Sequence, residues 1–176
     1  MIERFKERAE ELGLKIYQAT PQEDISIFEW WREISATPDG DLYEAFPQTT
    51  WALSRFYDLF NPPKVLLYVE DSDGIWFTVW MERLEAAVVF SSWVRESMRG
   101  TRAHYRTAKL SYEIAFEMSS TLIGITKRPE LLKLHEKIGY TILGSVPKLF
   151  DGQDDAWIVV LTKDAFQKGA LNNENL

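Results

Sequence analysis

The chain has 176 residues, of which 45% are hydrophobic and 14% aromatic, and its formal net charge is −7. This length and composition predict one folded domain and exclude an intrinsically disordered chain. With no cysteine and two histidines, the sequence excludes disulfides, cysteine nucleophiles and histidine-rich metal centres, so we expect no metal.

The polar patterning of the chain bears on its location and partners. No apolar run reaches the roughly 18 residues of a membrane span, and the first five residues lack the zones of a signal peptide, so we expect a cytoplasmic protein that does not enter a membrane. The acidic balance disfavours a broad phosphate-tracking surface and favours cationic partners such as amines or basic peptides. A net negative charge that only keeps the protein in solution explains the acidic composition equally well.

The first third of the chain predicts helices around one short strand. Apolar residues at helical spacing, closed by Gly13, predict a helix over 2–12, and a strand follows over 14–18. The capping-box pattern Thr20-Pro21-Gln22-Glu23 begins a helix that we expect to reach about residue 34. After a turn over 36–41, the pattern over 42–60 is helical again, with a kink or break at Pro47.

Residues 64–94 predict three strands joined by tight connections. The β-rich runs cover 64–70, 75–81 and 86–94, and Asp71-Ser72-Asp73-Gly74 is a hairpin signal between the first two. We therefore expect an antiparallel meander.

A basic cluster follows the meander, around a helix predicted from near residue 100 to about 118. Its members are Arg95, Arg99, Arg102, Arg106 and Lys109. Cations in a first helical turn oppose the macrodipole unless an anion is bound there, and free N–H groups at a helix start are a natural phosphate site. A solvated helix face that meets acidic residues elsewhere explains the cluster equally well.

The remainder predicts a strand over 121–125, a helix from Pro129 closed by Gly139, and two paired strands over 140–148 and 156–161. We expect a single domain over 1–166, in which 1–13 is a helical extension, and a polar, frayed tail over 167–176.

The helix that ends at Gly139 carries a family signature. Its residues, Leu134-His135-Glu136-Lys137-Ile138-Gly139-Tyr140, resemble the Leu-Tyr-Glu-Lys-Leu-Gly-Phe signature of the GNAT superfamily of acyl-CoA-dependent N-acyltransferases. The order of predicted elements over 14–165 is also similar. The resemblance implies an α+β fold, in which helices flank a mixed, mostly antiparallel sheet of about seven strands, here with an added N-terminal helix. It also implies an acetyl-CoA-dependent N-acetyltransferase that transfers its acetyl group directly to an amine of a small molecule or protein.

The resemblance also implies a cofactor loop. In the family, the fourth strand leads into a loop of pattern Arg/Gln-x-x-Gly-x-Gly/Ala, whose backbone amides hold the CoA pyrophosphate. The best register runs from Arg99 to His104, with Arg102 at the first glycine position and His104 at the Gly/Ala position. The residues expected to bind the cofactor are Val94, Arg99, Gly100, Thr101, Arg102 and Ala103.

Two residues are candidates for catalysis. His135 occupies the position of the signature tyrosine, which often protonates the departing CoA thiolate, and imidazole can donate a proton near neutral pH. Glu82, at the end of a predicted strand, is the candidate general base. Arg128 replaces the asparagine that often opens this segment in the family.

A second function is compatible with the same fold. Four departures from the family pattern favour a catalytically inactive GNAT-fold protein with a structural or protein-interaction role. They are the altered loop, the fourth strand without a carboxylate, and the changed tyrosine and asparagine positions. The chain also resembles small, divergent GNAT-like proteins of bacteriophages, some linked to virion assembly, which implies protein partners and a place in the host cytoplasm or the virion. Nucleic-acid binding through the basic cluster is disfavoured by the overall charge and the lack of a reader motif.

Overall fold

The computed structural model of the chain describes residues 2–19, 64–126, 128–150 and 154–172. The helices expected over 20–34 and 42–60 lie outside the described residues.

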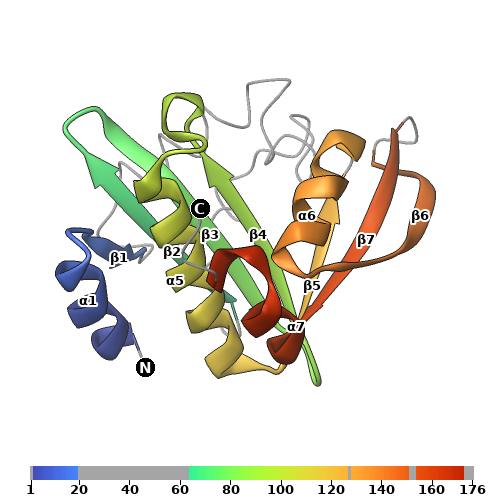
Figure 1. The fold of residues 1–176 in the computed structure, drawn as a ribbon, viewed down its shortest axis with the longest axis horizontal. Helices are drawn as coiled ribbons and strands as arrows, with labels where there is room; N and C mark the ends of the chain where they lie inside the picture. Colours follow the sequence, from blue (N-terminus) through green and yellow to red (C-terminus); the bar gives the residue numbers. More distant parts are fainter. Residues whose placement is uncertain (1, 20–63, 127, 151–153, 173–176) are drawn as a thin grey trace.

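One sheet organises the described residues (Figure 1). Its seven strands lie in the order β1-β2-β3-β4-β5-β7-β6, and every neighbouring pair is antiparallel except β4 and β5. The strands are β1 (Ile16–Gln18), β2 (Lys64–Asp71), β3 (Gly74–Arg83), β4 (Val88–Val94), β5 (Thr121–Thr126), β6 (Thr141–Phe150) and β7 (Asp154–Thr162). The predicted α+β class with a mostly antiparallel sheet is confirmed.

The parallel pair β4–β5 is the irregular feature of the sheet. Only Val88 and Val89 of β4 pair with β5, opposite Leu122 and Ile123, although both strands continue for several residues. Figure 1 shows the two strands diverging beyond this point. Their carboxyl ends therefore lie apart, and this edge of a parallel pair is where α/β folds commonly bind ligands.

The four described α-helices cover one face of the sheet. They are α1 (Ile2–Glu11), α5 (Arg102–Met118), α6 (Leu132–Ile138) and α7 (Lys163–Lys168). The β4-α5-β5 and β5-α6-β6 connections both join parallel strands in the same direction along the sheet, and right-handed crossovers then place α5 and α6 on one face. In Figure 1, these four helices lie in front of the strands.

The core lies between this face and α5. Leu110, Ile114 and Ala115 of α5 are at most 2% exposed and pack with equally buried residues of the central strands, such as Met81 and Leu122. The three α5 residues lie at helical spacing, so they share the face of the helix that meets the sheet. Each fully buried aliphatic side chain of this kind contributes about 1.5–3 kcal/mol to folding.

The end of the chain differs from the expected frayed tail. Helix α7 runs through Lys168, and the short 3-10 helix η4 (Ala170–Asn172) follows it. Phe166 and Leu171 are buried, and the Asn172 side-chain amide donates to the Phe166 carbonyl oxygen at 2.6 Å. The prediction from composition was wrong here because two apolar side chains anchor an otherwise polar segment. No described helix is long and apolar enough to cross a membrane.

Candidate functional site

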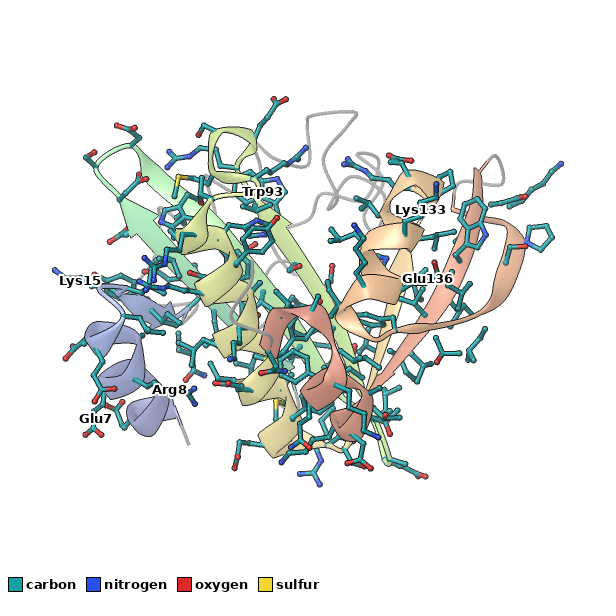
Figure 2. The ribbon with its side chains drawn as sticks, in the orientation of Figure 1. Glu7, Arg8, Lys15, Trp93, Lys133 and Glu136 are labelled. Carbon is teal, nitrogen blue, oxygen red and sulfur yellow. The ribbon has the colours of Figure 1, made fainter. Side chains whose placement is uncertain are left out.

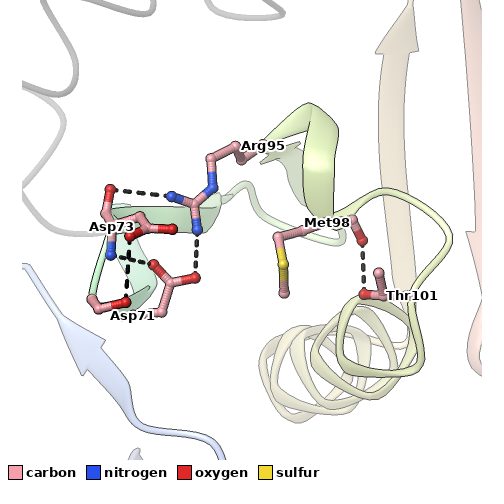
Figure 3. A network of polar contacts seen from close by, with 6 residues as sticks. Asp71, Asp73, Arg95, Met98 and Thr101 are labelled. Atoms are coloured by element: carbon pink, nitrogen blue, oxygen red, sulfur yellow. Dashed lines mark hydrogen bonds and ion pairs between the residues drawn. The ribbon is translucent and has the colours of Figure 1, made fainter.

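The loop between β4 and α5, residues 95–101, is called the α5 loop below. It contains the 3-10 helix η2 (Glu96–Met98), and Thr101 is the N-cap of α5. The Thr101 hydroxyl donates to the Met98 carbonyl oxygen at 2.8 Å and accepts the His104 N–H at 3.2 Å (Figure 3). Gly100 has φ +75, and no atom lies within 4 Å of the place where a Cβ would be. The backbone is therefore open on that side of the loop, as close approach of a ligand requires.

Most backbone N–H groups at the start of α5 already have acceptors. The N–H of Arg99 donates to the Glu96 carbonyl oxygen at 3.1 Å, and that of Thr101 donates to Met98 at 3.2 Å. The Gly100 N–H donates to Nδ1 of His104 at 3.2 Å. Within the described residues, the N–H groups of Arg102 and Ala103 have no such acceptor. Because these are first-turn donors, they are available to an anion at the positive end of the helix dipole.

Within the described residues, the cations of the first half of α5 have no carboxylate partner. Arg102, Arg106 and Lys109 form no ion pair with any described residue, and the guanidinium of Arg99 donates to the Val94 carbonyl oxygen at 3.4 Å. The first turn of α5 contains no acidic residue, so nothing in it offsets the repulsion between these cations and the dipole. Among the described residues, these cations therefore lack the acidic partners that the second explanation of the cluster requires.

Arg95 is the exception in the basic cluster. Its Nη2 lies 2.5 Å from Oδ2 of Asp71, and its Nη1 donates to the Asp73 carbonyl oxygen at 3.1 Å (Figure 3). The hydrogen bond from Arg95 lowers the pKa of Asp71. Arg95 therefore fastens the beginning of the α5 loop to the β2–β3 hairpin.

The expected cofactor residues lie together at the open end of the β4–β5 pair. Val94 ends β4 and packs partly against the core, next to Trp93 (Figure 2). Ala103 is the second residue of α5, and its side chain is partly buried against the core. Arg102 is exposed beside it. The structure thus places the cations and the two free amides of the first half of α5 beside the edge where the two strands separate.

His135 lies on α6, which Gly139 closes with φ +112. The imidazole is half-buried, and its Nδ1 is inaccessible to solvent and without a hydrogen-bond partner among the described residues. Burial lowers the pKa of His135. By contrast, Lys133 and Glu136 on the same helix are exposed (Figure 2). The ring is therefore mostly neutral at pH 7, and Nε2 is the nitrogen that can meet a ligand.

A series of aromatic rings joins His135 to the site of strand separation. The His135 ring lies 5.1 Å from that of Tyr140, edge to face, and the hydroxyls of Tyr140 and Tyr112 lie 3.4 Å apart. Tyr112 stacks on Phe90 of β4 at 4.7 Å. Burial raises the pKa of Tyr112 to about 12 and that of Tyr140 well above 10, so both phenols keep their protons. Sequence reasoning missed this pair, although Tyr140 differs from the signature phenylalanine by its hydroxyl.

Glu82 lies away from this arrangement. It is half-exposed on β3 and pairs with Val89, whereas the preceding residue, Met81, is fully buried opposite Phe90 on the face that α5 covers. Side chains alternate along a strand, so Glu82 points to the other face of the sheet. The structure does not bring Glu82 and His135 together. The described residues contain no cluster of three or more potential metal ligands.

A pocket of about 390 Å³ lies at the far end of α5, between α1, α5 and α7. Its walls include Glu7, Glu117 and Lys163, together with the ion pair between Arg8 and Glu113. None of the expected site residues lines it.

Comparison with solved structures identifies the architecture. A spermidine N-acetyltransferase from Vibrio cholerae, in complex with CoA and spermine, superposes with a TM-score of 0.65 at 13% identity, over 87% of this chain and 97% of that one. A Streptococcus mutans protein gives a TM-score of 0.65 at 15% identity, over 84% and 98%. A candidate phosphinothricin N-acetyltransferase gives 0.59 at 19%, over 85% and 98%.

The chain has the GNAT fold. The sequence alone matches no known family and no curated protein. The structural likeness confirms the fold that the resemblance implied.

Proposed function

We propose that this GNAT-fold protein is an N-acetyltransferase that transfers an acetyl group from acetyl-CoA directly to an amine. The observation that carries the proposal is the positive charge at the start of α5, for which the described residues supply no ion-pair partner. Arg102, Arg106 and Lys109 are without carboxylate partners in the described part of the chain, and two free amides lie beside them. This charge lies where the parallel strands separate.

The residues present fit the phosphates of the cofactor. The N–H groups of Arg102 and Ala103 supply backbone donors, and the side chains of Arg102 and Arg106 supply guanidinium groups, which bind phosphate through paired hydrogen bonds. Arginine at the usual glycine position thus replaces part of the backbone contact of the family with side-chain contact. When bound, acetyl-CoA supplies an activated acetyl thioester.

His135 supplies the proton for the leaving thiolate in this proposal. Its Nε2 is the ring nitrogen that remains available, and the contact with Tyr140 fixes the ring on α6. No covalent intermediate on the protein is needed, in keeping with the absence of cysteine. Glu82 remains the predicted base, and its position requires the amine to be deprotonated from the opposite face of the sheet or through water.

The acceptor is a cationic amine of a small molecule or a protein. The net charge of −7 favours the approach of such a substrate. One structural neighbour was solved with spermine, a polyamine, bound together with CoA.

Thermal unfolding with acetyl-CoA tests the cofactor part of the proposal. At about a hundredfold excess over Kd, acetyl-CoA adds roughly 2.7 kcal/mol, and we expect Tm to rise by about 5–10 °C. Arg102→Glu removes a cation that opposes the dipole, so the free variant should be more stable by about 0.3–1 kcal/mol, yet it should lose the shift. Lys133→Glu, an equal change of charge on α6, is the control and should keep the shift.

Transfer itself is measured as release of free thiol from acetyl-CoA with a panel of amines. Because the chain contains no cysteine, every thiol detected is CoA. The alternative, an inactive GNAT-fold protein that binds other proteins, is favoured by the internal hydrogen bonds of Arg99, Gly100 and Thr101 in the α5 loop. It predicts no shift with saturating acetyl-CoA, and that result would overturn the enzyme proposal.

A further inference from the structure

His104 stands at the Gly/Ala position of the family loop, yet its side chain belongs to the hydrogen bonding of the α5 loop. Nδ1 accepts the Gly100 N–H at 3.2 Å, while the His104 backbone N–H donates to the Thr101 hydroxyl, also at 3.2 Å. The two bonds join His104, the third residue of α5, to Gly100 and Thr101, which precede the helix. The pattern resembles a capping box, with imidazole in the place of the usual glutamate or glutamine, except that the imidazole accepts the N–H of Gly100, one residue before the N-cap Thr101.

The bond from Gly100 requires an unprotonated Nδ1, and the surroundings of the ring favour that state. The ring stacks on Tyr105 with centroids 5.5 Å apart and lies 6.4 Å from Phe77 of β3. The charged group that acts on it is Arg99, in the loop, and Tyr105 is its titratable neighbour on α5. Burial and then the charge of Arg99 lower the pKa of His104. At pH 7 the imidazole is therefore a hydrogen-bond acceptor.

We propose that His104 is a positioning residue that holds the α5 loop in its anion-binding conformation, so that affinity for the cofactor phosphates falls when the imidazole is protonated. The proposal rests on the proposed function, since it names the control of the same phosphate site. His104 acts through Gly100.

Protonation changes the contact from donor–acceptor to donor–donor. The Nδ1–H of imidazolium would face the Gly100 N–H, and the left-handed backbone of Gly100 would lose the bond that fixes it. The free amides of Arg102 and Ala103 follow directly, so their direction depends on this turn. A competing effect changes the affinity in the opposite direction. The positive charge of imidazolium near a phosphate site attracts the anion, so by itself it raises the affinity. The direction of the pH dependence therefore separates positioning from simple charge.

Calorimetric titration with CoA between pH 8 and pH 5 tests the proposal on wild type, His104→Gln and His104→Ala. Glutamine has a side-chain oxygen that can accept the Gly100 N–H and does not titrate, whereas alanine has no acceptor. At pH 8 we expect His104→Gln to bind like wild type and His104→Ala to bind about 2- to 12-fold more weakly, the factor for one net hydrogen bond. On acidification to pH 5, wild type should weaken by a similar factor relative to His104→Gln, which corrects for titration of CoA itself.

The amide resonance of Gly100, followed by NMR without CoA, is the second readout. It should shift with pH in wild type and stay constant in His104→Gln. Binding that strengthens on acidification relative to His104→Gln would overturn the proposal in favour of a charge effect. Parallel pH profiles of wild type and His104→Gln would overturn it outright. Absence of CoA binding by wild type at pH 8 would instead overturn the proposed function, and the positioning role with it.

Discussion

At the scale of single residues, His135 is the side chain whose chemistry depends most on its surroundings. On an exposed helix face its pKa would lie near 6.5, but burial lowers the pKa, and Nδ1 has no partner within the described residues. The acid form that a departing thiolate needs is therefore scarce at pH 7. The substitution of histidine for the family tyrosine changes the pH range of the proposed acid.

The corresponding prediction concerns the pH dependence of turnover. Because protonated imidazole is the acid, the part of kcat that depends on His135 should decline as pH rises through its lowered pKa. His135→Tyr restores a phenol, which ordinarily titrates near pH 10, and should move this decline to higher pH. His135→Gln should lower kcat by about 10²- to 10⁴-fold at the optimum, with little change in the Kd for CoA. Undiminished turnover by the glutamine variant would exclude the role.

At the scale of elements, two helix ends meet backbone to backbone and fix α6. A Cβ on Gly169, which follows α7, would lie 1.9 Å from the carbonyl oxygen of Ile138, the last residue of α6. A Cβ on Gly139 would lie 2.7 Å from the Ala165 carbonyl oxygen. The segment that was expected to be a frayed tail therefore positions the helix that carries His135.

We predict that Gly169→Ala is strongly destabilising, although its φ of −74 is open to any residue. The new methyl group has to displace backbone, which costs about 1–3 kcal/mol or more, so Tm should fall by at least several degrees in thermal unfolding. Lys168→Ala, in the same turn but exposed, is the control and should stay within about 0.5 kcal/mol. An unchanged Tm for Gly169→Ala would mean that α6 and α7 are not packed as described.

At the scale of the whole molecule, both histidines of the chain have lowered pKa values in the folded state. The unfolded chain therefore binds more protons than the folded one below about pH 6.5, and stability must rise with pH in this range. Burial is the main cause at both positions. Asp71 also makes stability fall on acidification, but at lower pH. Its pKa is lowered in the folded state, so its contribution to stability is complete above its ordinary pKa of 3.8 and is lost as pH falls below that value.

The prediction is that the free energy of unfolding decreases between pH 7 and pH 5, as measured by urea denaturation at several pH values. A His104→Gln/His135→Gln double variant should show a flatter profile over the same range, since glutamine does not titrate. If wild type and the double variant lose stability in parallel, other groups cause the loss and the two imidazoles are not buried as described.

The sequence by itself determined the order and approximate bounds of most elements, because periodicity and the placement of Gly and Pro are local. The hairpin at Asp71–Gly74, helix α5 and the helix closed by Gly139 are confirmed in this way. The signature around His135 led correctly to the GNAT fold. Within the described residues, local patterns failed at the carboxyl end, where burial of Phe166 and Leu171 against distant elements orders a polar segment.

The tertiary structure alone decided how these elements make a site. Three features depend on residues far apart in the chain. They are the pairing of β4 with β5 at only two positions, the lack of an ion pair at Arg102 within the described residues, and the ion pair of Arg95 with Asp71. The face on which Glu82 lies, opposite to α5, also follows from which helix covers the sheet. The physical reason is the same in each case. Burial, ion pairing and the pKa of an imidazole are set by neighbours in space, and no local pattern specifies them.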